Sequence, residues 1–469
     1  MVRLSRRSFL AAGGALALTG LVRPGRAATP RELRLTPRAG TAALAGPGWP
    51  QTEILGYDGR APGPEIRVRQ GDRLRIAVRN ELVEETTVHW HGIRLPIAMD
   101  GVPGLSQNPI PPGGTFLYDF EVPDAGTYWY HPHVRGFEQI DRGLAGALVV
   151  EEPDPPAVDR DVVWLLDDWR LGRDAQITDD FGVLMDISHG GRIGNTVTIN
   201  GAAPDGFALR AGERIRLRLI NAANGRLFSL LFEGHAPQVI AWDGQPTPPH
   251  VPAGERIVLG PAMRADLILD ATGTPGQRYR VVDDFYRARA YRLTDLAYAD
   301  APPRRGALPP VPALPRNTQP EPDLADPIRH TITLTGGMMG RMSEATLGGK
   351  RLDARSLMMR GKAWALNGVA AEGTMEKPLF ILPRRRTCVL TMINDTAWPH
   401  PMHLHGLPMK PLTRQGRPPP RAEWRDTVLL MPGERVEMGI VADNPGDWLF
   451  HCHIAEHMEG GMMGVIRVD

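Results

Sequence analysis

One strand-ending asparagine recurs three times in this sequence, and the repeat limits the fold more than any other feature. Asn80, Asn221 and Asn394 each end a stretch with apolar residues at every second position, the pattern of a half-buried β-strand. Long helical stripes are scarce, while 52 glycines and 45 prolines supply turns. The pattern predicts an all-β chain of three consecutive sandwich or barrel domains built mainly from antiparallel strands.

Residues at fixed distances after each repeat differ between the outer two copies and the middle copy. Nine and eleven residues after each asparagine stand His89 and His91, then Leu230 and Phe232, then His403 and His405. A later segment, counted five and seven residues from Gly126, Gly276 and Gly446, carries His131 and His133, then Val281 and Asp283, then His451 and His453. The middle copy is therefore expected to be a domain without metal ligands.

Composition shifts place the domain boundaries. Residues 151–161 are acidic and proline-rich, and residues 301–327 contain nine prolines, which is typical of an extended linker. We expect domain 1 at 29–152, domain 2 at 159–300, the linker at 301–327 and domain 3 at 328–469.

The first 28 residues have the pattern of an export signal. Arg6 and Arg7 precede Ser8-Phe9-Leu10, a mildly apolar stretch runs to Val22, and small residues stand at Ala27 and Ala28. This is typical of a twin-arginine signal, although a disordered basic tail is the alternative. The signal predicts the twin-arginine export machinery as a partner, export of the folded chain and a periplasmic location.

Ten of the fourteen histidines fall in four short clusters, and each cluster contains a His-x-His pair. Side chains on a strand alternate between faces, so the two histidines of each pair point the same way. Eight imidazoles suit a group of copper ions better than one zinc, which takes four ligands. The pairs are His89 and His91, His131 and His133, His403 and His405, and His451 and His453.

The same alternation predicts a second metal site behind the first. Cys452 lies between two paired histidines, so its sulfur should face away from them, and His400 stands at odd offsets from His403 and His405. His457 can fold back through a short loop, and Met462 can supply a weak axial sulfur. Two histidines, one cysteine and a distant methionine form the electron-transfer site of blue copper proteins.

The remaining features narrow the class of protein. The chain has 54 basic and 53 acidic residues, so no nucleic-acid footprint is expected, and no apolar run approaches the roughly 20 residues of a membrane span. Cys388 lies in an apolar stretch and is expected to be a buried free thiol. Four histidines outside the clusters are expected to be structural or surface residues: His189, His235, His250 and His330.

The four motifs together resemble those of three-domain multicopper oxidases of the laccase superfamily. The resemblance implies three cupredoxin-like Greek-key domains and four copper ions, with one type 1 copper and a trinuclear cluster between domains 1 and 3. It implies His400, Cys452, His457 and Met462 as type 1 ligands and His89 and His403 as type 2 ligands. It implies His91, His131 and His453 for one type 3 copper, and His133, His405 and His451 for the other.

The resemblance also implies a reaction in which four one-electron oxidations of a small reductant are coupled to reduction of O2 to two waters. Besides Cys452, the candidate catalytic residues are two acids. Asp100 matches an acid that family members place near the cluster, although an Asp before Gly also forms turns. A second family acid is replaced here by Met458, which leaves Glu456 and Glu459 beside the position as substitutes.

Two classes of reductant stay open, and we expect a monomer in either case. The first is phenols and aromatic amines, as in laccases. The second is Cu(I), in copper tolerance, which five methionines between 338 and 359 favour because thioethers suit Cu(I). The copper-efflux oxidases carry Asp and Met where this chain has Thr396 and Trp398, which favours the first class. The intact ligand set disfavours a copper-free structural protein, and copper nitrite reductases lack the paired type 3 histidines.

Overall fold

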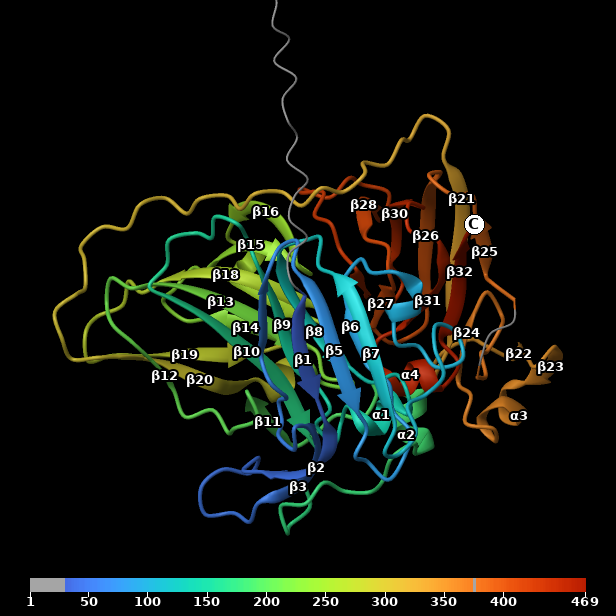
Figure 1. Ribbon diagram of the computed structural model, residues 1–469, viewed down its shortest axis with the longest axis horizontal. Helices are drawn as coiled ribbons and strands as arrows, with labels where there is room; N and C mark the ends of the chain where they lie inside the picture. Colours follow the sequence, from blue (N-terminus) through green and yellow to red (C-terminus); the bar gives the residue numbers. More distant parts are fainter. Residues whose placement is uncertain (1–29, 374–376) are drawn as a thin grey trace, which may run out of the picture.

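The computed structural model describes residues 30–373 and 377–469 and consists of three β-rich domains (Figure 1). The blue and cyan domain 1 lies between the green and yellow domain 2 and the orange and red domain 3. The predicted all-β fold is confirmed, and helices are limited to short segments. The predicted export signal lies outside the described residues. Across the described ranges, no helix is both long enough and apolar enough to span a bilayer.

Domain 1 has two main sheets and a hairpin. One sheet has the order β1-β5-β7 and the other β4-β9-β8-β6, while β2 pairs with β3. The bounds are β1 Arg31–Leu35, β2 Pro37–Ala42, β3 Thr52–Tyr57, β4 Ile66–Arg69, β5 Arg73–Arg79, β6 His89–His91, β7 Thr115–Glu121, β8 Gly126–His131 and β9 Gly146–Glu151.

Domain 2 has one six-stranded and one five-stranded sheet. One has the order β11-β10-β13-β18-β15-β16 and the other β12-β20-β19-β14-β17. The bounds are β10 Arg160–Trp169, β11 Thr196–Ile199, β12 Phe207–Leu209, β13 Arg214–Asn221, β14 Phe228–Phe232, β15 Gln238–Trp242, β16 Gln245–His250, β17 Arg256–Leu259, β18 Arg264–Asp270, β19 Arg278–Asp283 and β20 Tyr291–Tyr298.

Domain 3 has two five-stranded sheets, β24-β21-β26-β30-β28 and β25-β32-β31-β27-β29, with a hairpin of β22 and β23. The bounds are β21 Ile328–Gly336, β22 Glu344–Leu347, β23 Lys350–Asp353, β24 Trp364–Leu366, β25 Phe380–Leu382, β26 Thr387–Asp395, β27 His400–Leu404, β28 Met409–Arg414, β29 Thr427–Leu430, β30 Arg435–Val441, β31 Gly446–Cys452 and β32 Met463–Val468.

The three recurring asparagines have the same structural role in each domain. Each lies at the end of β5, β13 or β26, and each is fully buried. The side-chain oxygen accepts the backbone N–H two residues on, and the side-chain amide donates to two backbone carbonyls. Asparagine supplies the acceptor and the two donors that this corner needs, because buried polar backbone groups must be paired.

The strand pairs that carry the histidines do not share one register. His89 faces His131 across β6 and β8, and His403 faces His451 across β27 and β31. In the middle domain, Leu230 faces Asp283 rather than Val281, a difference of two residues. The glycine count from the sequence therefore aligns the outer domains correctly and the middle domain incorrectly.

Three short helices, one from each domain, pack together in the lower right part of the molecule in Figure 1. They are α1 (Gly136–Gln139), α2 (Leu184–Ser188) and α4 (Ala455–Glu459). A further short helix, α3 (Ala354–Met358), lies by β22 and β23. Residues 301–327 contain neither helix nor strand and pass over the top edge between domains 2 and 3.

Candidate metal centre

Eight imidazoles from domains 1 and 3 converge in one buried cluster, which we call the histidine cluster. Nε2 of His131 lies 3.5 Å from Nδ1 of His91 and 3.4 Å from Nε2 of His453. Nε2 of His405 lies 3.1 Å from Nε2 of His451. The structure thus brings together all four His-x-His pairs: His89, His91, His131, His133, His403, His405, His451 and His453.

The ring nitrogens of this cluster fit a group of metal ions. Nε2 of His89, His133 and His403 is buried and has no hydrogen-bond partner. The opposite nitrogen of two of these rings is held by the backbone, because Nδ1 of His89 donates to the Asp100 carbonyl at 2.7 Å and Nδ1 of His403 donates to the Asp426 carbonyl at 2.9 Å. Such bonds fix the tautomer that leaves Nε2 free as a ligand.

Burial also keeps the cluster in the protonation state that binds a cation. It lowers the pKa of six of these imidazoles well below the usual value, and the neighbouring rings lower it further. Neutral imidazoles are metal ligands. The six are His91, His131, His133, His405, His451 and His453.

A second donor set, the cysteine site, lies on the opposite face of β31. Sγ of Cys452 lies 3.5 Å from Nδ1 of His400 and 3.6 Å from Nδ1 of His457, and the two nitrogens are 3.1 Å apart. Met462 is fully buried in the same apolar core as Cys452, and its backbone N–H donates to the His457 carbonyl. A sulfur and two imidazole nitrogens at these distances match the three strong ligands of a blue copper site.

The cysteine site is enclosed by protein. Cys452, His400 and His457 are fully buried, and the Trp364 ring packs against both imidazoles at centroid distances of 5.0 and 4.3 Å. Burial raises the pKa of the Cys452 thiol and lowers the pKa of His457 to about 3. A bound cation would reverse the first effect, since a coordinating thiol is deprotonated.

The Nε2 atoms of His400 and His457, which point away from the sulfur, contact groups that no sequence motif predicts. Nε2 of His400 lies 2.9 Å from the Thr396 hydroxyl, and Nε2 of His457 donates to the His189 carbonyl at 2.6 Å. The His189 ring lies 5.3 Å from the ring of Trp398. His189 therefore contributes a backbone group from domain 2 to the edge of the cysteine site.

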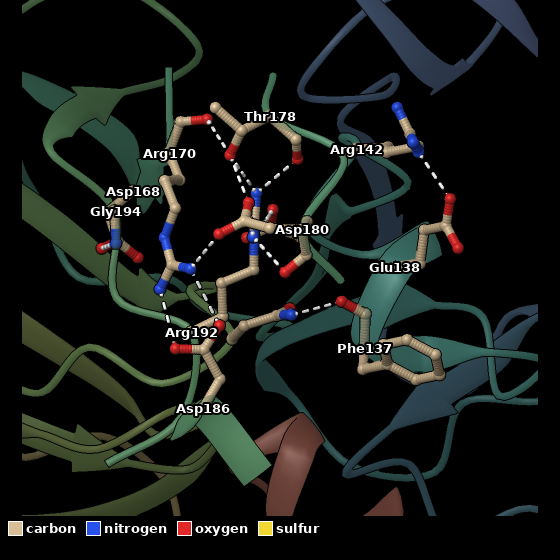
Figure 2. Close-up of polar contacts among 12 residues, drawn as sticks. Phe137, Glu138, Arg142, Asp168, Arg170, Thr178, Asp180, Asp186, Arg192 and Gly194 are labelled. Carbon is tan, nitrogen blue, oxygen red and sulfur yellow. Dashed lines mark hydrogen bonds and ion pairs between the residues drawn. The ribbon is translucent and has the colours of Figure 1, made fainter. Parts of the chain in front are cut away.

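Ion pairs fix the loop that brings His189 to this edge (Figure 2). Arg170 donates to Asp180 at 2.7 Å and to both carboxylate oxygens of Asp186 at 2.8 and 2.9 Å. Asp186 lies in α2, and His189 follows that helix directly. The helix that carries the His189 carbonyl to His457 is thus held by the ion pair between Arg170 and Asp186.

The two candidate acids occupy different surroundings. Asp100 is buried, with Oδ2 2.8 Å from Nδ1 of His405 and Oδ1 3.3 Å from Nδ1 of His89. Glu456 is also buried, accepts a hydrogen bond from Asn224 at 3.1 Å and has its second oxygen unpartnered. Burial raises the pKa of Glu456 to about 7. Asp100 contacts the histidine cluster directly, whereas Glu456 lies at the contact between α4 and domain 2.

Cys388 and three of the histidines outside the clusters contact other protein groups rather than the two donor sets. Cys388 is a buried free thiol, as is Cys452 in this structure. His235 bonds the Tyr298 hydroxyl at 2.5 Å, His250 lies 3.3 Å from Glu423, and His330 stacks on Phe380.

Sequence reasoning missed Asp426 and Thr427. Oδ1 of Asp426 lies 3.2 Å from Nε2 of His91, and the Thr427 hydroxyl lies 3.2 Å from Nδ1 of His403. Thr427 also faces His403 across β27 and β29. Thr427 begins the strand that pairs with β27 and Asp426 directly precedes it, so polar residues at the start of that strand were the available signal.

Comparison with known proteins agrees with this geometry. Three family profiles, each described as multicopper oxidase, match residues 41–155, 160–299 and 348–469. The chain is 32% identical to the multicopper oxidase MmcO of Mycobacterium tuberculosis, over 98% of this chain and 96% of that protein. It is 28% identical to the copper resistance protein A homolog of Pseudomonas syringae, over 100% and 99%.

Further matches are a fungal protein and a solved structure. Laccase-1 of Fomitopsis schrenkii is 32% identical, over 90% of this chain and 84% of that protein. The crystal structure of a multicopper oxidase from Pseudomonas thermotolerans superposes with a TM-score of 0.82 and 33% identity, over 94% of this chain and 100% of that one. The three cupredoxin-like domains expected from the sequence are therefore confirmed. The chain belongs to the multicopper oxidase family, whose members are copper-containing oxidoreductases that use O2.

Proposed function

We propose that this chain holds four copper ions and couples the oxidation of small aromatic reductants, phenols and aromatic amines, to the reduction of O2. Four reductant molecules give up four electrons and four protons, and one O2 takes them up to form two waters. Bound copper supplies the one-electron redox chemistry. The unpartnered Nε2 atoms of His89, His133 and His403 support metal binding in the histidine cluster.

We assign the ligands according to the two donor sets. His400, Cys452, His457 and Met462 hold the type 1 copper, and His89 and His403 hold the type 2 copper. His91, His131 and His453 hold one type 3 copper, and His133, His405 and His451 hold the other. The distances within each type 3 trio and within the cysteine site support this division.

The chain itself connects the two donor sets. His451 and His453 flank Cys452 in sequence, and their rings join the histidine cluster while the sulfur faces the other way. The backbone between sulfur and imidazole is one residue long on either side, which gives a short covalent path for electrons. Asp100 orients His89 and His405, and we propose that its carboxyl group also delivers protons, with Glu456 as a second acid.

The choice of aromatic reductants rests on the outer edge of the cysteine site. A neutral Thr396 hydroxyl, rather than a carboxylate, meets Nε2 of His400. The rings of Trp398 and His189 lie beside it, and both side chains are partly exposed. Aromatic faces favour stacking of an aromatic reductant, whereas a cation gains nothing from a hydroxyl already engaged with His400.

Cu(I) is the second candidate, and exposed thioethers favour it. Met338, Met339 and Met359 are 43%, 75% and 80% exposed, although large apolar side chains are usually more buried. Met338 bonds Ser188 and Trp398 through its backbone, so this stretch lies near the same edge. The name of the Pseudomonas syringae relative points in the same direction.

Steady-state kinetics with a dimethoxyphenol and with stabilised Cu(I), run side by side, separate the two candidates. We expect the higher kcat/KM for the phenol, and we expect Trp398→Ala to lower that value about tenfold, the order of one lost stacking contact. Met359→Ala, at an exposed position, is the matched control. A much higher kcat/KM for Cu(I), reduced by Met339→Leu, would reverse the order.

We also propose that the chain is exported folded to the periplasm as a monomer. The twin-arginine pattern at residues 6 and 7 supports the route. Replacing both arginines by lysine should leave the protein in the cytoplasm, and light scattering of the exported protein should give a mass for one chain.

A further inference from the structure

Arg264 of the middle domain meets both outer domains at one buried point. It begins β18, is fully buried, and binds the Asp426 carboxylate through both terminal nitrogens, at 2.7 and 2.6 Å. Its Nε donates to the Thr127 carbonyl of domain 1 at 3.2 Å. One guanidinium therefore contacts a domain 1 strand and a domain 3 loop at the same time.

Asp426 also contacts two imidazoles of the histidine cluster. Its Oδ1 lies 3.2 Å from Nε2 of His91, and its backbone carbonyl accepts from Nδ1 of His403 at 2.9 Å. The Thr427 hydroxyl donates to the same Oδ1 at 2.8 Å. A single residue thus contacts one imidazole from each outer domain, and both imidazoles face the cluster with their other nitrogen.

The Asp426 carboxylate lies between the Arg264 guanidinium and the His91 imidazole. The carboxylate oxygen accepts the N–H of His91 at Nε2, which leaves Nδ1 on the cluster side, 3.5 Å from Nε2 of His131.

The contact between Arg264 and Asp426 leaves no room for a side chain at the neighbouring Gly92. Gly92 follows His91 with φ of 87°, and a Cβ at this position would collide with the Arg264 guanidinium and the Asp426 carboxylate. Other buried arginines of the middle domain lack this relation. Arg216 is equally buried and binds Glu152 and Asp266, and neither acid bonds an imidazole.

We propose that Arg264 is a positioning residue for the histidine cluster. Through Asp426 it fixes the ring orientation and tautomer of His91 and His403, so the middle domain takes part in metal binding although it provides no ligand. The inference rests on the proposed copper cluster and goes beyond it, because it assigns a role to a domain that the ligand motifs leave out.

The test compares Arg264→Gln with Arg264→Lys and the control Arg216→Gln. The metal-free proteins are titrated with copper while the type 1 absorption band, the type 2 electron paramagnetic resonance signal and the bound copper are measured. We expect Arg264→Gln to weaken copper binding in the histidine cluster 10- to 100-fold, the cost of losing an outer contact to a ligand. The type 1 band should stay, and Arg264→Lys should recover part of the affinity.

A readout on the metal-free protein is independent of copper and of turnover. Nitrogen-15 chemical shifts of the imidazoles report the tautomer, and we expect His91 to change in Arg264→Gln and to stay unchanged in Arg216→Gln. If Arg264→Gln does not fold, Arg264→Lys is measured in its place. Lysine keeps the positive charge but lacks the two nitrogens that bind both carboxylate oxygens of Asp426.

Two results would overturn the proposal. One is that the Arg264 variant binds copper like Arg216→Gln and shows the wild-type shifts. The other is that it loses the type 1 band to the same extent as the type 2 signal. Failure of the proposed function itself looks different, because the wild-type protein would then bind far fewer than four copper ions.

Discussion

The outer domains and the middle domain use the same pair of strands for different purposes. His89 faces His131 in domain 1, whereas in domain 2 Leu230 faces Asp283, whose carboxylate accepts the backbone N–H groups of Ser229 and Phe285. In the middle domain this position is therefore filled by an apolar side chain and by a carboxylate that binds the backbone. In the outer domains the same position holds imidazoles of the histidine cluster.

Charge in the middle domain lies on a different pair of strands. Arg216 and Arg218 of β13 and Arg264 of β18 are buried and reach acids in the adjoining segments. The pairs are Arg216 with Glu152, Arg218 with Asp161, and Arg264 with Asp426. The comparison teaches that the middle domain is not a passive spacer. Arg216 binds Glu152 of domain 1, Arg218 donates to the Thr127 hydroxyl of domain 1, and Arg264 binds Asp426 of domain 3.

The largest expected effect comes from removing the sulfur of the cysteine site. Cys452→Ser should abolish the blue colour and lower turnover by more than the 10- to 100-fold cost of losing an outer contact, since a first ligand and the covalent path are both lost. Absorption spectra and O2 uptake measure the two effects. Thermal unfolding of the metal-free protein should change little, because serine is nearly the same shape.

Cys388→Ser is the matched control, at the other buried cysteine of the same domain. Burial raises the pKa of that thiol to about 12, and it lies in β26 away from the donor set. Colour and turnover should persist in this variant. A blue Cys452→Ser protein would show that the type 1 assignment is wrong.

Much of the site could be predicted because strands alternate their side chains with a period of two. That rule placed His403 and His405 on one face of their segment and His400 on the other, and it turned Cys452 away from its neighbours, as the distances now show. The asparagine repeat was equally readable, since its hydrogen bonds are local in sequence and recur at fixed offsets.

The rest depends on packing between segments that are distant in sequence. Asp426 lies 335 residues from His91, and no local pattern connects them. The glycine alignment failed in the middle domain for a local reason. Gly126 and Gly446 begin their strands with φ of 154° and 143°, whereas Gly276 has φ of 74° and lies two residues before β19. The same residue type ends a turn in one domain and begins a strand in the others.

Copper binding should stabilise the outer strand pairs more than the middle pair. A ligand that binds only the folded state adds about 4 kcal/mol at a free concentration 1,000 times its dissociation constant, which slows amide exchange about a thousandfold. We expect this slowing in β6, β8, β27 and β31, and less than about tenfold in β14 and β19. Hydrogen exchange followed by mass spectrometry, with and without copper, measures it.

Magnesium at the same concentration is the control, because imidazole and thiolate are poor ligands for it. Equal slowing in β14 and β19 would break the comparison, since it would show that the three domains open as one unit and share the stabilisation.

The smallest expected effect concerns the ion pair between Asp161 and Arg218. Burial alone would raise the pKa of Asp161. The hydrogen bonds and charge of Arg218, at 2.7 and 2.8 Å, together with the charges of Arg216 and Arg67, outweigh burial and lower the pKa to about 2. An unfolded chain protonates this group near its ordinary value of about 3.9, so the unfolded state binds more protons between about pH 4 and pH 2. The stabilisation is therefore fully present above about pH 4 and is lost as the pH falls through about 2.

Asp161→Asn should lower the free energy of unfolding of the metal-free protein by about 2.6 kcal/mol at pH 7, as a shift of nearly two pKa units implies. The difference from wild type should shrink as the pH falls below about 4, and urea unfolding at a series of pH values measures it. Asp179→Asn, at an exposed acid paired with Arg142 at 2.7 Å, is the control and should change stability by less than about 0.5 kcal/mol. If the wild-type and Asp161→Asn curves stay parallel down to about pH 3, or if Asp161→Asn alters the type 1 band as well as stability, the division between metal-holding outer domains and a charge-holding middle domain does not extend to this contact.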